Sequence, residues 1–89
     1  MKNRMTVKQY KAALIRATQG LGITDLEFQG NYWPYPQADQ SHLAVWRKSM
    51  PKKRIEIPVV NTDISGALIR MGQNAPSPSV TAKMIKDIV

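Results

Sequence analysis

The stretch QSHLAVWRKSMPKKRIEIPVV, residues 40–60, decides the fold of this chain. Apolar and polar side chains alternate over residues 41–48 and again over residues 54–60, which is the pattern of a β-strand with one buried face. Between the two runs, SMPKK at residues 49–53 supplies residues typical of a turn. The stretch therefore predicts a β-hairpin.

Alternation divides the side chains of this hairpin between two faces. Ile55, Ile57 and Val59 share the apolar face of the second strand, where we expect them to be buried. Leu43 and Val45 are their natural partners on the first strand. The other face is predicted to carry a mixed set of side chains, namely His42, Ala44, Trp46 and Lys48 from the first strand and Arg54, Glu56 and Pro58 from the second.

Five of the thirteen Lys and Arg residues lie in the hairpin, and no acidic residue lies between positions 40 and 55. Such a cluster is the electrostatic footprint of a site for a polyanion. Trp46 adds an aromatic ring on which a nucleic-acid base could stack. The alternative is that cations at an exposed hairpin tip only keep the edge soluble and unpaired. The predicted nucleic-acid-binding residues are Trp46, Arg47, Lys48, Lys52, Lys53 and Arg54.

Length and composition indicate one soluble domain, residues 1–89. The hydrophobic fraction of 43% is enough for a folded core, and the chain lacks the apolar run of about 18 residues that indicates a membrane span. No signal-peptide pattern is present, so we expect a cytoplasmic protein. The net charge of +7 favours nucleic acid or an acidic protein as the partner.

The same composition leaves few catalytic chemistries open. Without cysteine there is no disulfide and no thiolate metal site, and a single histidine leaves no zinc site of the usual type, so we expect neither a metal nor a cofactor. Phosphate-binding loops of the GxxxxGK or GxGxxG kind are absent, as is a recognisable nucleophilic triad. His42 remains, and histidine is the side chain that gives and takes protons at neutral pH. It could move a proton to or from a ribose 2′-hydroxyl during RNA cleavage, while Lys and Arg stabilise charge on the phosphate.

Helix signals precede the hairpin. Thr6 and Gln9 form a capping box at the start of an amphipathic segment, which predicts a helix over residues 7–19. Gly20 is expected to end this helix in a left-handed conformation, and residues 1–5 are expected to form a frayed basic lead.

A strand and an aromatic loop lie between this helix and the hairpin. Leu26 and Phe28 alternate with polar residues, which predicts a short half-buried strand. Two prolines interrupt the following loop, which holds Tyr32, Trp33 and Tyr35. The loop is expected either to stack on bases or a protein partner, or to cover one end of the core.

Two further helices are predicted after the hairpin. Residues 62–71 place apolar residues on one face, and Gly72 follows as a stop signal. The last helix begins at Pro78 after a Ser77 cap and is expected to run to the C-terminus, with an apolar stripe of Val80, Met84, Ile85 and Ile88. The predicted fold class is thus α+β, a three-stranded antiparallel sheet with helices packed on one face, in the order α-β-β-β-α-α.

Several segments are similar to those of one known family. They are the pair Ser41-His42, where that family has Gly-Ser-His; the following LAVWRK; RIEIPV, which is like its RVTVP strand; and SPSVTAKMIKDI, which is like its proline-rich lead into a final helix. Over residues 7–88 the chain thereby resembles the HicA family of mRNA-interferase toxins, small proteins with a double-stranded-RNA-binding-like fold. The resemblance implies that His42 is the catalytic residue of an endoribonuclease, a hydrolase of mRNA, and that an acidic HicB-like antitoxin is its partner.

The chain also departs from that family. Gln40 stands in place of the glycine, and the helix predicted over residues 62–71 is extra, because the family usually passes directly from its third strand to its last helix. Three functions therefore stay open: a toxin that cleaves RNA through His42, a non-catalytic nucleic-acid-binding module that uses the same hairpin, and a phage- or plasmid-encoded inhibitor that docks on an acidic protein.

Overall fold

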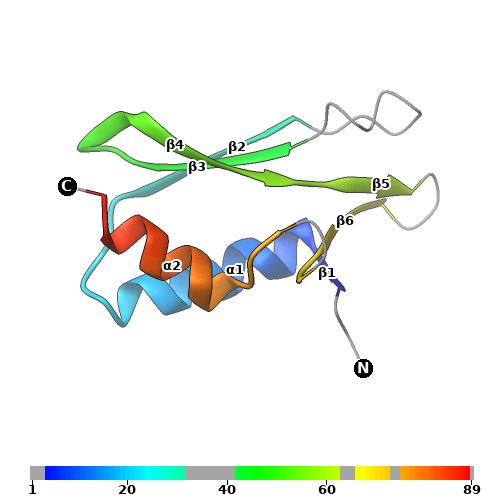
Figure 1. Ribbon diagram of the computed structural model, residues 1–89, viewed down its shortest axis with the longest axis horizontal. Helices are drawn as coiled ribbons and strands as arrows, with labels where there is room; N and C mark the ends of the chain where they lie inside the picture. The colour runs from blue at the N-terminus through cyan, green and yellow to red at the C-terminus, as the bar shows by residue number, and fades with distance from the viewer. Residues whose placement is uncertain (1–3, 32–41, 63–65, 73–74, 89) are drawn as a thin grey trace.

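A three-stranded antiparallel sheet with two helices on one of its faces forms the body of the molecule (Figure 1). The structure, a computed structural model, describes residues 4–31, 42–62, 66–72 and 75–88. Within these ranges no helix is long and apolar enough to cross a membrane. The predicted α+β class and the three-stranded sheet, in the order β2-β3-β4, are confirmed. In chain order the elements are β1 (Arg4–Thr6), α1 (Val7–Gln19), β2 (Leu26–Asn31), β3 (His42–Arg47), β4 (Met50–Pro58), β5 (Val60–Thr62), β6 (Gly66–Arg70) and α2 (Pro78–Lys86).

The hairpin of β3 and β4 has the two faces that the sequence predicts. Leu43 lies opposite Ile57, and Val45 lies opposite Ile55. Leu43, Val45 and Ile57 have no exposed surface, and Val59 is also buried, whereas Ile55 is only partly buried. The apolar face is the one on which the helices pack.

The turn of the hairpin is shorter than predicted. Arg47 already pairs with Met50, so Lys48 and Ser49 alone make the turn, and residues 50–53 belong to β4. The register between the strands shifts at this end of the hairpin, because β4 has more residues than β3 between the paired positions. The cations of the predicted turn are therefore held on an irregular strand rather than in a loop.

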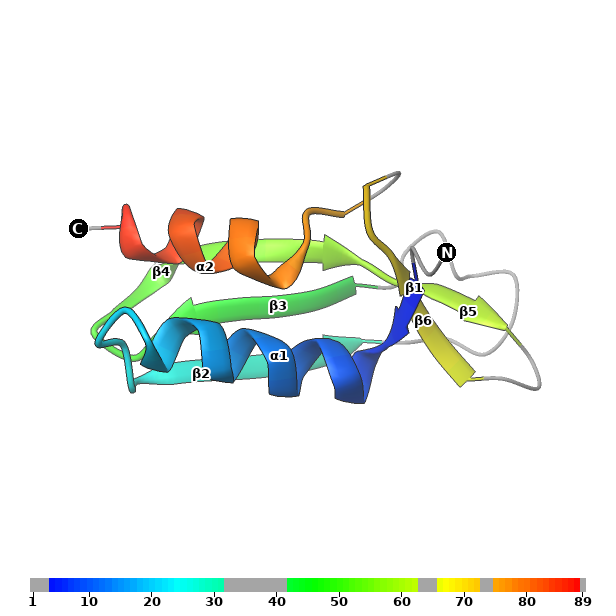
Figure 2. The ribbon, with the colours of Figure 1, turned by 90° about the horizontal axis from the view of Figure 1, so that it is seen from below.

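The two helices cover different parts of the sheet. Figure 2 shows α1 running along β2 and α2 running along β4, with β3 between them. Tyr10 and Leu14 of α1 and Ile85 of α2 have no exposed surface. Burying one large apolar side chain contributes roughly 1.5–3 kcal/mol. Strand β3 is thus the centre both of the sheet and of the core.

Helix α1 begins as predicted, but its left-handed glycine lies later. The Thr6 hydroxyl accepts a hydrogen bond from the Gln9 N–H, and the Gln9 side chain accepts one from the Thr6 N–H, both at 3.1 Å. Gly20 keeps a right-handed conformation with φ −63°, and Gly22 is the left-handed residue, with φ 82°. Glycine adopts this conformation without the steric penalty of a Cβ atom, so Gly22 turns the chain towards β2.

Residues 62–71 do not form the predicted helix. The described part of this segment, which leaves out residues 63–65, pairs as the antiparallel strands β5 and β6. In β6 the buried Ile69 is followed by the exposed Arg70, which is the alternation of a strand and not the stripe of a helix.

A strand from the start of the chain explains why that prediction is wrong. Strand β1 pairs with the other side of β6, which gives a second sheet in the order β1-β6-β5. Met5 lies opposite Ile69, and Arg4 lies opposite Arg70. The described part of the predicted frayed lead is thus a strand. Local helical spacing could not reveal a partner so distant in sequence.

Helix α2 starts at the predicted Ser77 cap but turns a different face to the core. Val80 and Met84 of the predicted stripe are 47% and 43% exposed, while Thr81 and Ile85 are buried. The prediction of an inward-facing Val80 and Met84 is therefore wrong, although that of Ile85 is confirmed.

A buried pair of hydroxyl groups explains this orientation. The Tyr10 hydroxyl donates to the Pro76 carbonyl oxygen at 2.7 Å and lies 2.6 Å from the Thr81 hydroxyl. Burial raises the pKa of the Tyr10 phenol, and the hydrogen bond with Thr81 opposes part of this rise. A buried polar group without a partner costs about 1–3 kcal/mol. Because each hydroxyl satisfies the other, Thr81 takes the inward position that an apolar stripe would assign to Val80.

Substitution of Ile57 tests the register of the hairpin. Ile57→Ala should lower the free energy of unfolding by about 2–5 kcal/mol, because it removes buried methyl groups and leaves a cavity opposite Leu43. Val80→Ala, on the exposed side of α2, should change it by less than about 0.5 kcal/mol. Urea unfolding followed by circular dichroism measures both, and equal losses would contradict the assigned register.

Candidate nucleic-acid interface

The face of the β2-β3-β4 sheet that points away from the helices carries several of the predicted site residues. Alternation along each strand and the pairing register place them on one side of the sheet. Figure 1 shows no described helix over this side. We call it the open face and define it by Glu27 and Gln29 of β2, His42 and Trp46 of β3, and Arg54 and Glu56 of β4.

Trp46 and Arg54 form a stacked pair on the open face. The guanidinium carbon of Arg54 lies 4.3 Å from the centre of the Trp46 ring. The Arg54 Nε also donates to the Pro51 carbonyl oxygen at 3.4 Å. A cation–π contact at an exposed site contributes about 0.5–1 kcal/mol, which is enough to bias the guanidinium plane without consuming its other donors. The pair is therefore a planar, charged surface on which a base can stack.

The lysines of the hairpin tip project towards solvent. Lys52 and Lys53 are exposed. Lys48 Nζ lies 3.9 Å from a carboxylate oxygen of Glu27, and the two side chains are 67% and 43% exposed. Exposed ion pairs of this kind contribute at most about 1 kcal/mol to stability. The contact is therefore weak enough for Lys48 to exchange Glu27 for another anion. We call Lys48, Lys52 and Lys53 the basic tip.

Arg47, in contrast, is directed inward by Asp25. Its Nε donates to Asp25 Oδ1 at 3.0 Å, and the two side chains are only 28% and 27% exposed. The other carboxylate oxygen accepts hydrogen bonds from the Ser49 hydroxyl at 3.1 Å and the Ser49 N–H at 3.4 Å. The Lys48 N–H donates to the Asp25 carbonyl oxygen at 2.9 Å. Asp25 thus holds the turn against the start of β2. Because the Arg47 guanidinium is already paired with Asp25, fewer of its donors remain for a phosphate.

These contacts favour the charged form of Asp25. Desolvation alone would raise the pKa of its carboxyl group, but hydrogen bonds from Arg47 and Ser49 and the Arg47 charge outweigh that effect. The net result is a pKa below the ordinary value of 3.8.

His42 lies at the end of β3 that is far from the basic tip. It is half-buried, and its backbone pairs with Asn31 of β2 and Pro58 of β4. It is four positions from Trp46 on the same face, which corresponds to about 13 Å along a strand. The structure therefore brings Trp46 and Arg54 together and separates both of them from His42.

Glu56 is a candidate residue that the sequence alone did not single out. It pairs with Ala44, and it is thereby the diagonal neighbour of His42 across β3 and β4. Diagonal neighbours in an antiparallel pair lie about 7–8 Å apart, which flexible side chains or one water can bridge. Alternation already placed Glu56 on the open face. Its distance from His42 depends on the pairing register of β3 and β4, which could not be predicted from the sequence.

Comparison with known proteins identifies no relative. No protein-family model, curated protein or solved structure matches the chain. Among the described residues there is no group of three or more His, Cys, Asp or Glu side chains that could hold a metal ion. The aromatic loop with Tyr32, Trp33 and Tyr35, and the predicted Ser41 position, lie outside the described residues.

Replacing Asp25 by asparagine tests the role of its charge. Because the folded-state pKa is depressed, the stabilising contribution is present above the unfolded-state value of 3.8 and is lost as the pH falls through the lower folded-state value. Wild type should therefore melt at a higher temperature than Asp25→Asn near pH 7, and the gap should narrow as the pH falls below 3.8. Glu27→Gln serves as the control, since its exposed contact should give little gap at any pH. A gap for Asp25→Asn that does not change with pH would show that shape, not charge, is responsible.

Proposed function

We propose that this protein binds RNA across the open face and the basic tip. The observation that carries the proposal is the Trp46–Arg54 pair, 4.3 Å apart, because it sets a stacking surface beside exposed lysines. The net charge of +7 adds a long-range attraction for a polyanion. Lysine contacts to phosphates supply affinity, and the stacked pair supplies a contact with bases.

An unpaired stretch of RNA suits this surface better than a duplex. In an A-form duplex the bases stack on one another, so proteins contact mainly the backbone and the minor groove. A partly exposed tryptophan and an exposed arginine on a sheet stack only on a base that has left its neighbours. Messenger RNA, which has single-stranded regions in the cytoplasm, is the substrate class that fits this requirement.

We further propose that the protein cleaves the RNA that it binds, in the manner of a HicA-like toxin, and that His42 is the catalytic residue. It lies on the same face as Trp46, about 13 Å away along β3, so that one RNA strand could reach both. In the family that the chain resembles, the corresponding histidine would be catalytic. The order α1, β2, β3, β4, α2 is consistent with the fold that this resemblance implies, with the β5–β6 hairpin inserted before α2.

Cleavage at His42 would use the ribose 2′-oxygen as the nucleophile. This oxygen attacks the adjacent phosphorus, the bond from phosphorus to the 5′-oxygen breaks, the 2′-hydroxyl loses a proton and the 5′-oxygen gains one. His42 would carry one of these protons, and Glu56, its diagonal neighbour, is placed to help with the other. Cations of the basic tip would hold flanking phosphates rather than the scissile one, because they lie at the other end of β3.

The partner proposed for such a toxin is an acidic antitoxin. An acidic surface complements the basic tip and would compete with RNA for it. A docking inhibitor of an acidic protein would use the same cations, but it would gain nothing from a base-stacking surface. The Trp46–Arg54 pair therefore favours the RNA proposal over that alternative.

The salt dependence of RNA binding tests the basic tip. Replacing Lys52 and Lys53 together by glutamine should weaken the affinity for all single-stranded RNA sequences alike. It should also reduce the slope of log affinity against log salt by up to about 1.4, because each lost phosphate contact accounts for about 0.7. The matched control replaces Lys83 and Lys86, exposed on α2, by glutamine and should leave the slope nearly unchanged. Fluorescence anisotropy at several salt concentrations measures both, and equal slopes for the two double variants would contradict the assignment.

Substitution of His42 separates catalysis from binding. His42→Ala should slow cleavage of a long unstructured RNA by about 10² to 10⁴-fold, which is the usual contribution of a general acid or base. The melting temperature and the RNA affinity should stay close to those of wild type. Lys83→Ala, at an exposed position of α2 on the other side of the sheet, is the control and should cleave normally.

Other outcomes of the same measurements have clear meanings. If His42→Ala loses thermal stability and activity together, then His42 is a packing residue. If purified wild type leaves the RNA intact between about pH 5 and 9, the protein binds RNA without cleaving it. If wild type binds no RNA, the proposed function is wrong and an acidic protein is the partner to seek.

A further inference from the structure

Strand β2 has an outer edge that no described strand covers. In the sheet order β2-β3-β4 it stands at the end and pairs with β3. The Lys48 N–H donates to the Asp25 carbonyl oxygen, which fixes Asp25 as a residue whose backbone faces β3. Backbone direction alternates along an antiparallel strand, so the N–H and C=O groups of Leu26 and Phe28 point outward. Since no described strand pairs with these groups, they form an edge to which a further strand can be added.

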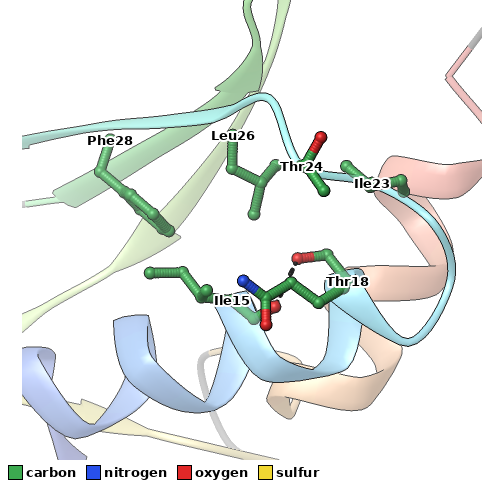
Figure 3. A pocket seen from close by; sticks show the side chains of 7 residues that line it. Ile15, Thr18, Ile23, Thr24, Leu26 and Phe28 are labelled. Carbon is green, nitrogen blue, oxygen red and sulfur yellow. Dashed lines mark hydrogen bonds between the residues drawn. The ribbon is translucent and has the colours of Figure 1, made fainter.

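A groove lies directly beside this edge, between β2 and α1. Figure 3 shows Leu26 and Phe28 pointing from β2 towards Ile15 of α1, with Thr18 and Ile23 nearby. The groove has a volume of about 250 Å³, and Ile15 is 39% exposed in it. Pockets for whole small ligands usually measure about 300–1,000 Å³. This groove therefore suits one or two apolar side chains rather than a cofactor.

Positive charge borders the groove. Lys11 Nζ lies 5.4 Å from the centre of the Phe28 ring. Lys8 precedes Lys11 by one helical turn on α1, and Ile15 follows it by one, so the three share a stripe. None of the described residues that line the groove is acidic, and Glu27 of β2 points to the open face. A ligand that fits the charge of this stripe is acidic.

We propose that an extended acidic segment of a partner protein binds here, adding a strand to the outer edge of β2 and placing an apolar side chain in the groove. Its backbone pairs with the outward groups of Leu26 and Phe28, and its alternate side chains face α1. Its carboxylates lie near Lys8 and Lys11. The groove is on the helix side of the sheet, so this inference does not depend on RNA binding by the open face.

The chemistry of the groove selects a peptide over a nucleic acid. An exposed strand edge repeats its donors and acceptors at the spacing of another strand, about 6.8 Å for every second residue. The groove walls supply apolar contacts from Ile15, Leu26 and Phe28, which match aliphatic side chains and not phosphates. The two lysines at one border can pair with a few carboxylates. They do not form the continuous row of cations that binds a phosphate backbone.

A displayed library of random peptides about ten residues long tests the proposal. Wild type is the target, and Ile15→Glu, which puts a negative charge into the groove, is the counter-target. The matched control is Val80→Glu, the same change at an exposed apolar position of α2. Enriched peptides should be rich in Asp and Glu and have apolar residues at every second position. They should bind Ile15→Glu at least about tenfold more weakly than wild type, and Val80→Glu like wild type.

Two further measurements locate the peptide. An enriched peptide should slow amide hydrogen exchange at Leu26 and Phe28, and methylation of its own alternate amide nitrogens should abolish binding. Replacing Lys8 and Lys11 together by glutamine should weaken binding about tenfold, whereas the same change at Lys83 and Lys86 should not. This pair of variants keeps the test valid even if Ile15→Glu fails to fold.

Several results would overturn the proposal. They are the absence of enriched peptides, binding that is equal for wild type and both groove variants, and unchanged amide exchange at Leu26 and Phe28. A loss of RNA affinity in folded Ile15→Glu as large as that in the Lys52 and Lys53 double variant would also overturn it, because the groove would then belong to the RNA site.

Discussion

The packing of β3 against the helices is the constraint on which the rest of the structure depends. Leu43 and Val45 have no exposed surface, and the strand that carries them is the central one of its sheet. Because side chains alternate along a strand, the residues between and beside these two must face the other way. The presence of His42 and Trp46 on one face, which no described helix covers, is therefore a consequence of how the core is built, and not of a separate folding unit for the site.

The turn of the hairpin is held in place by hydrogen bonds, while its lysine side chains are exposed. Asp25 draws Arg47 inward and holds Ser49, so the turn has little freedom, whereas Lys52 and Lys53 remain exposed. Binding to charges that are already held on an ordered backbone costs less conformational entropy than binding that first has to order a loop. Trp46 and His42 lie along β3, and Arg54 of β4 stacks on Trp46, so an RNA strand bound as proposed would run along β3 rather than around one pocket.

The sequence predicted what depends on neighbours along the chain and missed what depends on distant partners. Alternation was sufficient to place Ile57 and Trp46 on opposite faces, and the Thr6 and Ser77 caps follow from local hydrogen bonding. The strand nature of β6 depends on β1, and the inward turn of Thr81 depends on Tyr10, so neither was visible in local spacing. In the site, the open face was predictable, but the shift of register that sets the Trp46–Arg54 contact was not.

The hydroxyl pair beneath the sheet joins residues that are 71 positions apart in the chain, and β1 pairs with β6 over nearly the same separation. During synthesis on a ribosome, α1 therefore emerges long before α2, and the Tyr10 hydroxyl has no Thr81 partner until residue 81 has been made. Contacts of such long range close slowly, and exposed apolar surface in the interval attracts chaperones or other nascent chains. A nascent chain that ends before Thr81 would thus leave the Tyr10 hydroxyl without this partner and α1 without α2 packed against it.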